Sequence, residues 1–192
     1  MKGRQKTLSF LTQNEIKCLL TKAKEHSHRD YTMILLAYRH GLRASEICNI
    51  TLDNIDLDAQ NIRCERGKGS ICNWQQLSKD EVKAVKTYLK KRPKTNSKYV
   101  FISRKGDALS RIQFYRLFKT LCEKAGMSKD KCNPHILKHS IGTHLANAGT
   151  PMQVIQSRLG HRDIKNTMVY LSIANAYVDK AFEIALNNGA VA

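Results

Sequence analysis

The spacing of apolar residues changes along the chain, and this change constrains the fold more than any other feature. Up to about residue 50, apolar side chains recur at helical spacing. Between residues 55 and 77 they alternate instead in three short runs, the pattern of half-buried strands. The helical spacing then returns. The pattern predicts an α+β fold that is mainly helical and contains a small antiparallel three-stranded sheet.

Start and stop signals set the limits of the predicted helices. Thr12 and Glu15 have the spacing of a capping box, and Ser78 and Ser110 precede helices that we expect to end near Lys91 and Ala125. The remaining helices are expected at residues 29–40, 45–50, 134–148, 151–159, 164–169 and about 173–186.

Two turns connect the predicted strands. Residues 58–61 join the first pair, and Gly67-Lys68-Gly69 joins the second pair, with a glycine on each side that permits positive φ. If these three residues form the loop, Cys64 faces Cys72 across the hairpin. Directly opposed strand residues can be close enough for a disulfide, and free thiols are the alternative.

The charge of the chain indicates its kind of partner. Its 192 residues include 33 Lys+Arg against 16 Asp+Glu, a formal net charge of +17. Such an excess predicts a polyanionic partner, with nucleic acid first, while a generically basic protein is the alternative. The basic residues are spread through the chain and are not gathered in one amphipathic helix. This distribution argues against binding to a membrane surface.

Several sequence features predict where the protein works. Residues 1–10 are basic and polar, without the apolar stretch of a signal peptide, and no run approaches the roughly 20 apolar residues of a membrane span. We therefore expect a cytoplasmic protein associated with the nucleoid. The six cysteines form no Cys-x-x-Cys pair, so we expect free thiols and no zinc site.

A candidate phosphate site begins at Asn133. This residue suits a helix N-cap, and Pro134 suits the first helical position. His135, Lys138 and His139 then share one face close to the helix start. Free backbone amides and the helix dipole favour an anion there, whereas the alternative is a solvated basic helix start.

A second candidate segment follows. Pro151 begins a helix that ends at Leu159, Gly160 suits the left-handed position after it, and His161 lies at the exit. Asp163 is expected to cap a short helix that carries Tyr170. A tyrosine hydroxyl can act as a covalent nucleophile, and the alternative is a core tyrosine with a satisfied hydroxyl.

Together these segments resemble the tyrosine recombinases, or phage-integrase-type site-specific recombinases. The resemblance begins at residues 41–47, Gly-Leu-Arg-Ala-Ser-Glu-Ile, and includes Lys68 and the His-x-Leu-Arg-His-like segment at 135–139. It ends with Leu-Gly-His at 159–161 and Tyr170. Residues 39–41, 101–106 and 159–162 look most similar to the fimbrial phase-switch DNA invertases.

The resemblance implies one domain organisation. A catalytic domain is expected at residues 8–186, with loose termini at 1–7 and 187–192 and without the N-terminal core-binding domain of larger family members. The implied partners are double-stranded DNA, further copies of the chain in a dimeric or tetrameric synapse, and a DNA-bending accessory protein. The amphipathic segment 176–186 would dock on a neighbouring copy or on its own core.

The resemblance also implies DNA cleavage and rejoining, with inversion of a segment between short inverted repeats. Tyr170 would form a 3′-phosphotyrosyl bond, and Arg43 would clamp the phosphate. Lys68 would protonate the leaving 5′-oxygen, while His135 and His161 would stabilise the pentavalent phosphorus. No cofactor or metal is expected. The implied supporting residues are Glu46 and His139.

Lys138 departs from the family, which has arginine at this position. Lysine keeps the charge but lacks the planar fork of arginine. Loss of one charge-assisted hydrogen bond costs about 1.5–3 kcal/mol, a slowing of roughly 10- to 150-fold. Arg158 or Arg162 could take the place of the missing guanidinium. Alternatively, the chain is a weakened or inactive DNA-binding regulator on the same fold.

Overall fold

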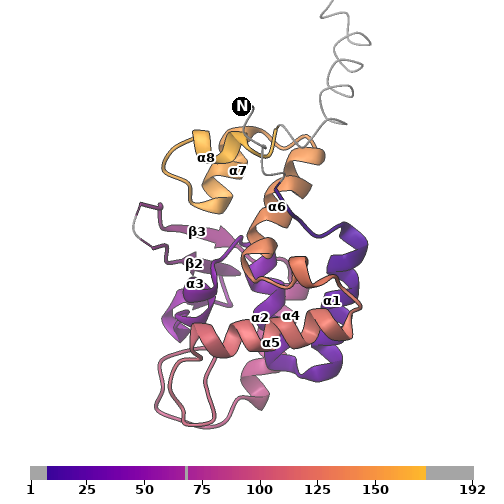
Figure 1. Cartoon of the computed structure of the whole chain (residues 1–192). Helices are drawn as coiled ribbons and strands as arrows, with labels where there is room; N and C mark the ends of the chain where they lie inside the picture. Colours follow the sequence, from indigo (N-terminus) through magenta and orange to yellow (C-terminus); the bar gives the residue numbers. More distant parts are fainter. Residues whose placement is uncertain (1–7, 68, 172–192) are drawn as a thin grey trace, which may run out of the picture.

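The computed structural model describes residues 8–67 and 69–171 (Figure 1). The predictions for Lys68, for a helix at about 173–186 and for the loose termini lie outside the described residues. They remain predictions.

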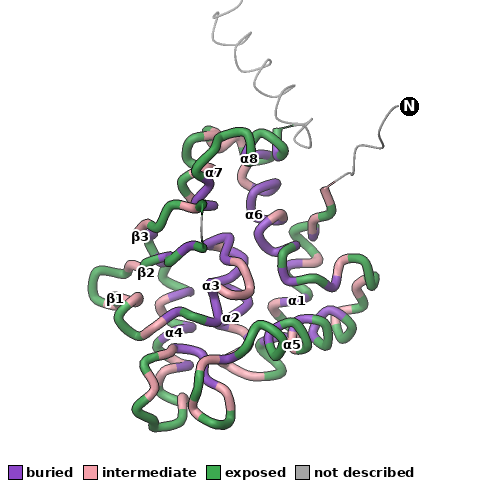
Figure 2. Tube along the Cα trace, turned by 60° about the vertical axis from the view of Figure 1, so that its left-hand side comes forward, coloured by how far each residue is buried: buried purple, intermediate pink, exposed green. Residues whose placement is uncertain are grey.

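The first two helices build the centre of the fold. Helix α1 spans Gln13–His26, and the predicted capping box is confirmed, since Thr12 N donates to Glu15 Oε2 at 2.7 Å. Helix α2 spans His28–Arg39 and is buried without interruption from residue 32 to residue 38. It contacts α1, α4 and α6. Figure 2 shows this buried segment in the middle of the molecule.

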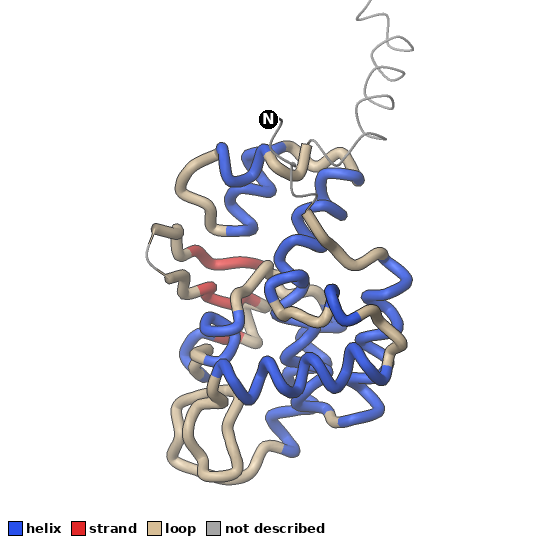
Figure 3. Tube along the Cα trace, viewed as in Figure 1, coloured by secondary structure: helices blue, strands red, loops and turns tan. Residues whose placement is uncertain are grey.

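The predicted three-stranded sheet is confirmed (Figure 3). It follows helix α3 (Ala44–Cys48) and a 3-10 turn at Leu52–Asn54. The antiparallel order is β1-β2-β3. The burial of alternate residues in β2 explains the alternating sequence pattern, because one face of the strand meets the core. The strand limits are Ile55–Asp56 for β1, Asn61–Cys64 for β2 and Asn73–Gln76 for β3.

The expected register of the second hairpin is wrong. Cys64 pairs with Asn73 and not with Cys72, and both cysteines are free thiols. The loop is longer than three residues because residues 70 and 71 bond to the segment after α7 instead of extending β3. Ile71 N donates to Gly160 O at 2.9 Å, and residue 70 forms an isolated bridge with residue 161. The hairpin is therefore held against the segment that follows α7.

The helices that follow the sheet, α8 included, agree with the predicted limits to within one residue at each end. Tyr170 lies in the turn after α8 instead of within the helix. The extended segment at 99–102 makes isolated bridges but no named strand. The observed limits are Lys79–Lys91 for α4, Arg111–Lys124 for α5, Lys129–Lys131 for a 3-10 turn, His135–Asn147 for α6, Met152–Leu159 for α7 and Lys165–Met168 for α8.

The arrangement of the elements brings distant segments together. In Figure 1 the β2–β3 hairpin lies between α3 on one side and α7 and α8 on the other, and α6 rises from the core beside them. Helix α6 contacts both α2 and α7. Among residues 8–67 and 69–171, no helix has the length and apolar character needed to cross a membrane.

Candidate active site

Arg43 lies directly before α3 and is oriented by Glu46. The Glu46 carboxylate accepts from Arg43 N at 2.8 Å and from Arg43 Nη1 at 2.7 Å, so it binds both the backbone and the side chain. Nη1 also donates to Ser70 Oγ at 3.1 Å. Burial raises the pKa of Glu46, but the Arg43 amide and the charge of Arg66 outweigh it, so the pKa is lowered. Glu46 is an ionised anchor for Arg43, whose side chain remains 36% exposed.

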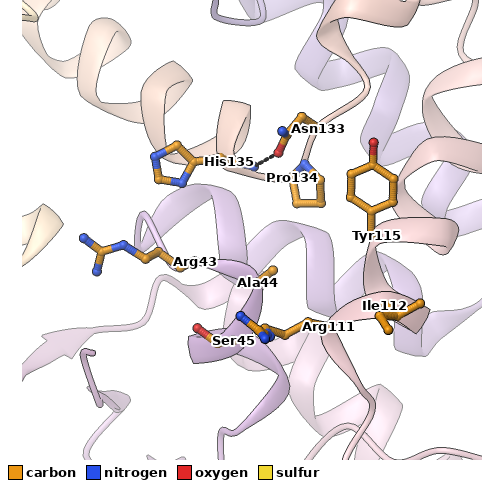
Figure 4. Close-up of a pocket in the computed structure, with 9 residues that line it drawn as sticks. All are labelled: Arg43, Ala44, Ser45, Arg111, Ile112, Tyr115, Asn133, Pro134 and His135. Atoms are coloured by element: carbon orange, nitrogen blue, oxygen red, sulfur yellow. Dashed lines mark hydrogen bonds between the residues drawn. The ribbon is translucent and has the colours of Figure 1, made fainter. Parts of the chain in front are cut away.

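The start of α6 supplies His135. Asn133 Oδ1 accepts from His135 N at 3.0 Å, and Pro134 has helical dihedrals, as the sequence pattern predicts. Figure 4 shows the His135 ring on the same side of a surface cavity as the Arg43 guanidinium. Partial desolvation, followed by the charges of Lys138 and Arg43, lowers the pKa of His135. The ring is therefore biased toward its neutral form when no anion is bound.

Lys138 lies deeper in the protein than His135. Its side chain is buried, and Nζ donates to Leu159 O at 2.6 Å, which ties α6 to the end of α7. Burial, then the charges of Arg66 and Arg43, lowers the pKa of Lys138 to about 7. A buried anion would favour the charged form of this lysine.

Tyr170 is packed against α6. Its side chain is only 1% exposed, and a Cβ added to Gly142 would lie 2.5 Å from Tyr170 Cζ, so only glycine leaves room for the ring. Tyr170 Oη lies 3.3 Å from His139 Nδ1. Burial raises the pKa of Tyr170 to about 12. Burial, then the charges of His135 and Lys138, lowers the pKa of His139 to about 4, so a neutral imidazole faces a protonated phenol.

His161 follows Gly160, whose φ of +66° confirms the predicted left-handed end of α7. His161 Nδ1 and Thr167 Oγ1 are 3.0 Å apart, so α8 orients the imidazole ring. Burial, then the charges of Lys138 and Arg43, lowers the pKa of His161 to about 4. The same lysine therefore acts electrostatically on all three histidines of the site.

The two arginines considered as substitutes for the missing guanidinium lie differently. Arg158 Nε donates to Arg39 O at 3.1 Å, and its side chain lines a separate cavity near the start of α4. Arg162 is exposed. Of these three basic side chains, Lys138 is the one that donates to Leu159 O at the end of α7. Lys68 lies outside the described residues.

Sequence reasoning missed three side chains that bind residues of the site. Ser70 binds Arg43, and Thr167 binds His161, but hydroxyl residues in loops and short helices carry no distinctive signal. Arg66 is the third, and its side chain is completely buried beside Glu46. Within the described parts of the chain, no group of three or more His, Cys, Asp or Glu side chains could hold a metal ion.

This geometry suits a phosphate ester. Cationic groups, neutral imidazoles and a tyrosine hydroxyl converge from α3, the hairpin, α6 and the α7–α8 segment. Arginine and lysine bind non-bridging phosphate oxygens, an imidazole can transfer a proton, and a phenol can attack phosphorus.

Comparison with known proteins identifies the family. Residues 9–176 match the model of the phage integrase family, so the chain belongs to this family of tyrosine recombinases. The solved crystal structure of XerA recombinase has the same fold, with a TM-score of 0.80 and 27% identity over 91% of this chain. This chain spans 64% of that XerA chain.

Two curated relatives come from fimbrial regulation, as the sequence resemblance predicts. The type 1 fimbriae regulatory protein FimB of Escherichia coli K12 is 42% identical over 174 residues, which cover 88% of this chain and 86% of FimB. FimE of the same strain is 35% identical over 167 residues, which cover 84% of each chain. Each match covers most of this chain and most of the relative.

Proposed function

We propose that this chain is a site-specific DNA recombinase that cleaves and rejoins DNA through a 3′-phosphotyrosyl intermediate on Tyr170. We further propose that it inverts a segment between short inverted repeats. Membership of the phage integrase family and the net charge of +17 support DNA as the substrate. The similarity to FimB and FimE supports a phase-switching role.

One observation carries the proposed chemistry, the contact between Tyr170 and His139 inside a cationic site. Tyr170 Oη lies 3.3 Å from His139 Nδ1, and the His139 and His135 ring centroids are 4.5 Å apart. His135 in turn lines the cavity that also includes Arg43. The groups that we propose as nucleophile, base and phosphate clamp are therefore neighbours.

The proposed cleavage step is a transesterification. The Tyr170 oxygen attacks the scissile phosphorus, and the phenolic proton passes to His139 Nδ1. The bond between phosphorus and the 5′-oxygen breaks, and that oxygen takes a proton, for which Lys68 is the proposed donor. Attack by a free 5′-hydroxyl reverses the step and reseals the strand. One phosphoester replaces another, so the step needs no external energy source.

The other residues stabilise charge in this proposal. Arg43 and Lys138 would bind non-bridging oxygens, and His135 and His161 would donate to the phosphorane. Lys138 and His161 are buried, and preorganised donors act more strongly in a desolvated environment than in water. Bound phosphate would raise the lowered pKa values of the histidines and of Lys138, which favours their donor forms.

A non-catalytic DNA-binding regulator is the second candidate. Two observations favour it. Lys138 Nζ is engaged by Leu159 O at 2.6 Å, and the Tyr170 side chain is 1% exposed, so both must shift to reach DNA. A regulator would need the cationic surface but not an accessible tyrosine.

A nicked suicide duplex tests the proposal. The duplex is first selected from random-sequence DNA by repeated binding to the purified chain. The wild type should leave a covalent protein–DNA adduct that disappears in Tyr170→Phe. Tyr177→Phe, a change of the same kind seven residues away, is the matched control and should retain the adduct. Tight binding of the selected duplex without any adduct would instead support the regulator.

Inversion and self-association need a separate assay. A plasmid with two selected sites in inverted orientation should yield inverted product, and the same sites in direct orientation should yield little excision. A dimeric or tetrameric synapse on DNA should appear in native mass analysis of the complex. Excision at the same efficiency would contradict an inversion-specific role.

A further inference from the structure

We propose that Arg66 is a positioning residue that holds the Arg43 and His161 segments of the active site at their working separation. This inference rests on the proposed function of the same site. Arg66 follows β2 by two residues and is not part of the family motifs in the sequence.

The Arg66 guanidinium connects four parts of the chain. Its side chain is 0% exposed. Nη1 donates to Gly41 O at 2.9 Å and to Glu46 Oε2 at 3.1 Å. Nη2 donates to His40 O at 2.7 Å and to Arg158 O at 2.8 Å. The end of β2 is therefore bonded to the turn before Arg43, to the carboxylate that orients Arg43, and to the last turn of α7.

These contacts link both halves of the site. Gly41 lies two residues before Arg43, and Arg158 lies three residues before His161. The two segments are more than a hundred residues apart in the chain. Ile71 N donates to Gly160 O at 2.9 Å and closes the same assembly from the hairpin side. A shift of the Arg66 guanidinium would therefore move Arg43 and His161 relative to each other.

Only arginine has the shape for this role. Its planar fork carries five donors with fixed directions, whereas the lysine ammonium is a compact charge with three donors. The two Nη atoms of Arg66 already make four hydrogen bonds to three backbone carbonyls and one carboxylate. A lysine at residue 66 would keep the charge but could not bridge the same set of acceptors.

The end of α7 is shaped around this side chain. A Cβ added to Gly160 would lie 2.9 Å from Arg66 Nε and 2.8 Å from Ile71 O. The glycine therefore gives room to the guanidinium as well as permitting the positive φ. The Leu-Gly-His segment packs directly against Arg66.

Folding stability alone does not account for an arginine here. The Arg66 charge lowers the pKa of Lys138, next in strength after burial, so the two buried cations repel each other. A cation buried beside another cation is unfavourable unless it is paired, and Glu46 is its carboxylate partner. The positioning role accounts for an arginine at residue 66 despite its repulsion of Lys138.

The test compares adduct formation at saturating DNA with DNA affinity in three variants. Arg66→Gln should slow adduct formation about 100-fold, the effect of a misplacement of about 1 Å, with little change in DNA affinity. Arg66→Lys keeps the charge and should recover only part of the rate. Each rate is expressed per folded molecule, so loss of stability does not enter the comparison.

Arg92→Gln is the matched control. Arg92 also binds backbone carbonyls, since Nη2 donates to Ser97 O at 2.9 Å and to Tyr99 O at 2.6 Å, but it lies outside the site. This variant should lose stability and keep the wild-type rate of adduct formation. A wild-type rate in Arg66→Gln, or an equal loss of rate in Arg92→Gln, would overturn the positioning role.

Hydrogen exchange separates this inference from the proposed function. Arg66→Gln, or Arg66→Lys if the first variant does not fold, should exchange the Ile71 and His161 amides faster than the wild type. Unchanged exchange at both amides would overturn the inference. If the wild type forms no adduct, the proposed function fails, while the exchange result still tests the link through Arg66.

Discussion

Two partly buried polar clusters begin on either side of Gly41 in the chain, one at residues 39–40 and one at residue 43, and they differ in charge balance. We call the first the balanced cluster; it consists of Arg39, His40, Gln75, Asp80 and Glu81. We call the second the cationic cluster; it consists of Arg43, Glu46, Arg66, Lys138 and His161. Both contain arginine, histidine and glutamate. The first has two carboxylates for one arginine and one histidine, whereas the second has one carboxylate for two arginines, a lysine and a histidine.

In the balanced cluster the charges stabilise one another. Arg39 Nη2 lies 2.7 Å from Asp80 Oδ2, and His40 Nε2 lies 3.0 Å from Glu81 Oε1. The hydrogen bond from Arg39 is the main cause that lowers the pKa of Asp80 to about 2. Burial opposes ionisation of Glu81, but His40 and Ser78 outweigh it and lower its pKa to about 2. Nothing in this cluster requires a further anion.

In the cationic cluster the pKa shifts of the basic side chains run against their charged forms. The pKa of Lys138 is lowered to about 7 and that of His161 to about 4, chiefly through burial and then through neighbouring positive charge. A site of this kind is short of negative charge, and a phosphate would supply it. We infer that charge balance distinguishes the structural network of the first cluster from the candidate anion site of the second.

Removing one carboxylate from each cluster should give the largest effects. Glu46→Gln leaves Arg43 and Arg66 without a carboxylate, and loss of one partner of a buried ion pair costs about 3–5 kcal/mol. Chemical denaturation should show this loss, and adduct formation should fall in the remaining folded protein. Glu81→Gln should also lower stability but keep the adduct rate per folded molecule. An equal loss of adduct rate in both variants would contradict the functional difference between the two clusters.

Crowding the tyrosine should have the next largest effect. In Gly142→Ala the new Cβ would lie 2.5 Å from Tyr170 Cζ, so the ring must move. We expect adduct formation to slow about 100-fold, with DNA affinity unchanged because the atoms nearest to the added Cβ all belong to Tyr170. Gel assays of adduct formation and DNA binding measure both quantities. A wild-type rate would mean that the packed position of the Tyr170 ring does not affect its attack on phosphorus.

Restoring the family's arginine should have an effect of similar or smaller size. Lys138→Arg adds a planar fork at the same position and should speed adduct formation by roughly 10- to 150-fold. Single-turnover rates on the nicked duplex measure it. An unchanged or slower rate of adduct formation would show that Lys138 does not occupy the position of the family's arginine.

Neutralising the same lysine should change the free energy of unfolding less than Glu46→Gln does, and in the opposite direction. Lys138→Met should raise the free energy of unfolding at neutral pH by about 1–4 kcal/mol, since a buried cation is replaced by an apolar chain. Folding lowers the Lys138 pKa from 10.5 to about 7, so the unfolded chain binds more protons between these values and wild-type stability rises with pH across this window. The advantage of Lys138→Met should therefore shrink as the pH rises.

The control for this pH dependence is Lys83→Met, which removes an exposed lysine of α4. Denaturation curves at several pH values should show no comparable change in that variant. A constant advantage of Lys138→Met at every pH would contradict the lowered pKa of the buried lysine.

The sequence predicted the helices well because their ends depend on local chemistry, such as the capping box at Thr12 and the glycine after α7. It could not predict the register of the hairpin, because residues 70–71 pair with residues 160–161, far along the chain. Arg66 was missed because most of its acceptors are backbone carbonyls, which every residue has. Gly142 was missed because its importance depends on the distant Tyr170.

Identification of the linked residue tests the central claim most directly. After reaction with the nicked duplex, the protein is digested, and the peptide of residues 166–180, which contains both Tyr170 and Tyr177, is fragmented by mass spectrometry. We predict a 3′-phosphonucleotide on Tyr170 and none on Tyr177. A nucleotide on another residue, or a bound duplex with no covalent nucleotide at all, would contradict the account.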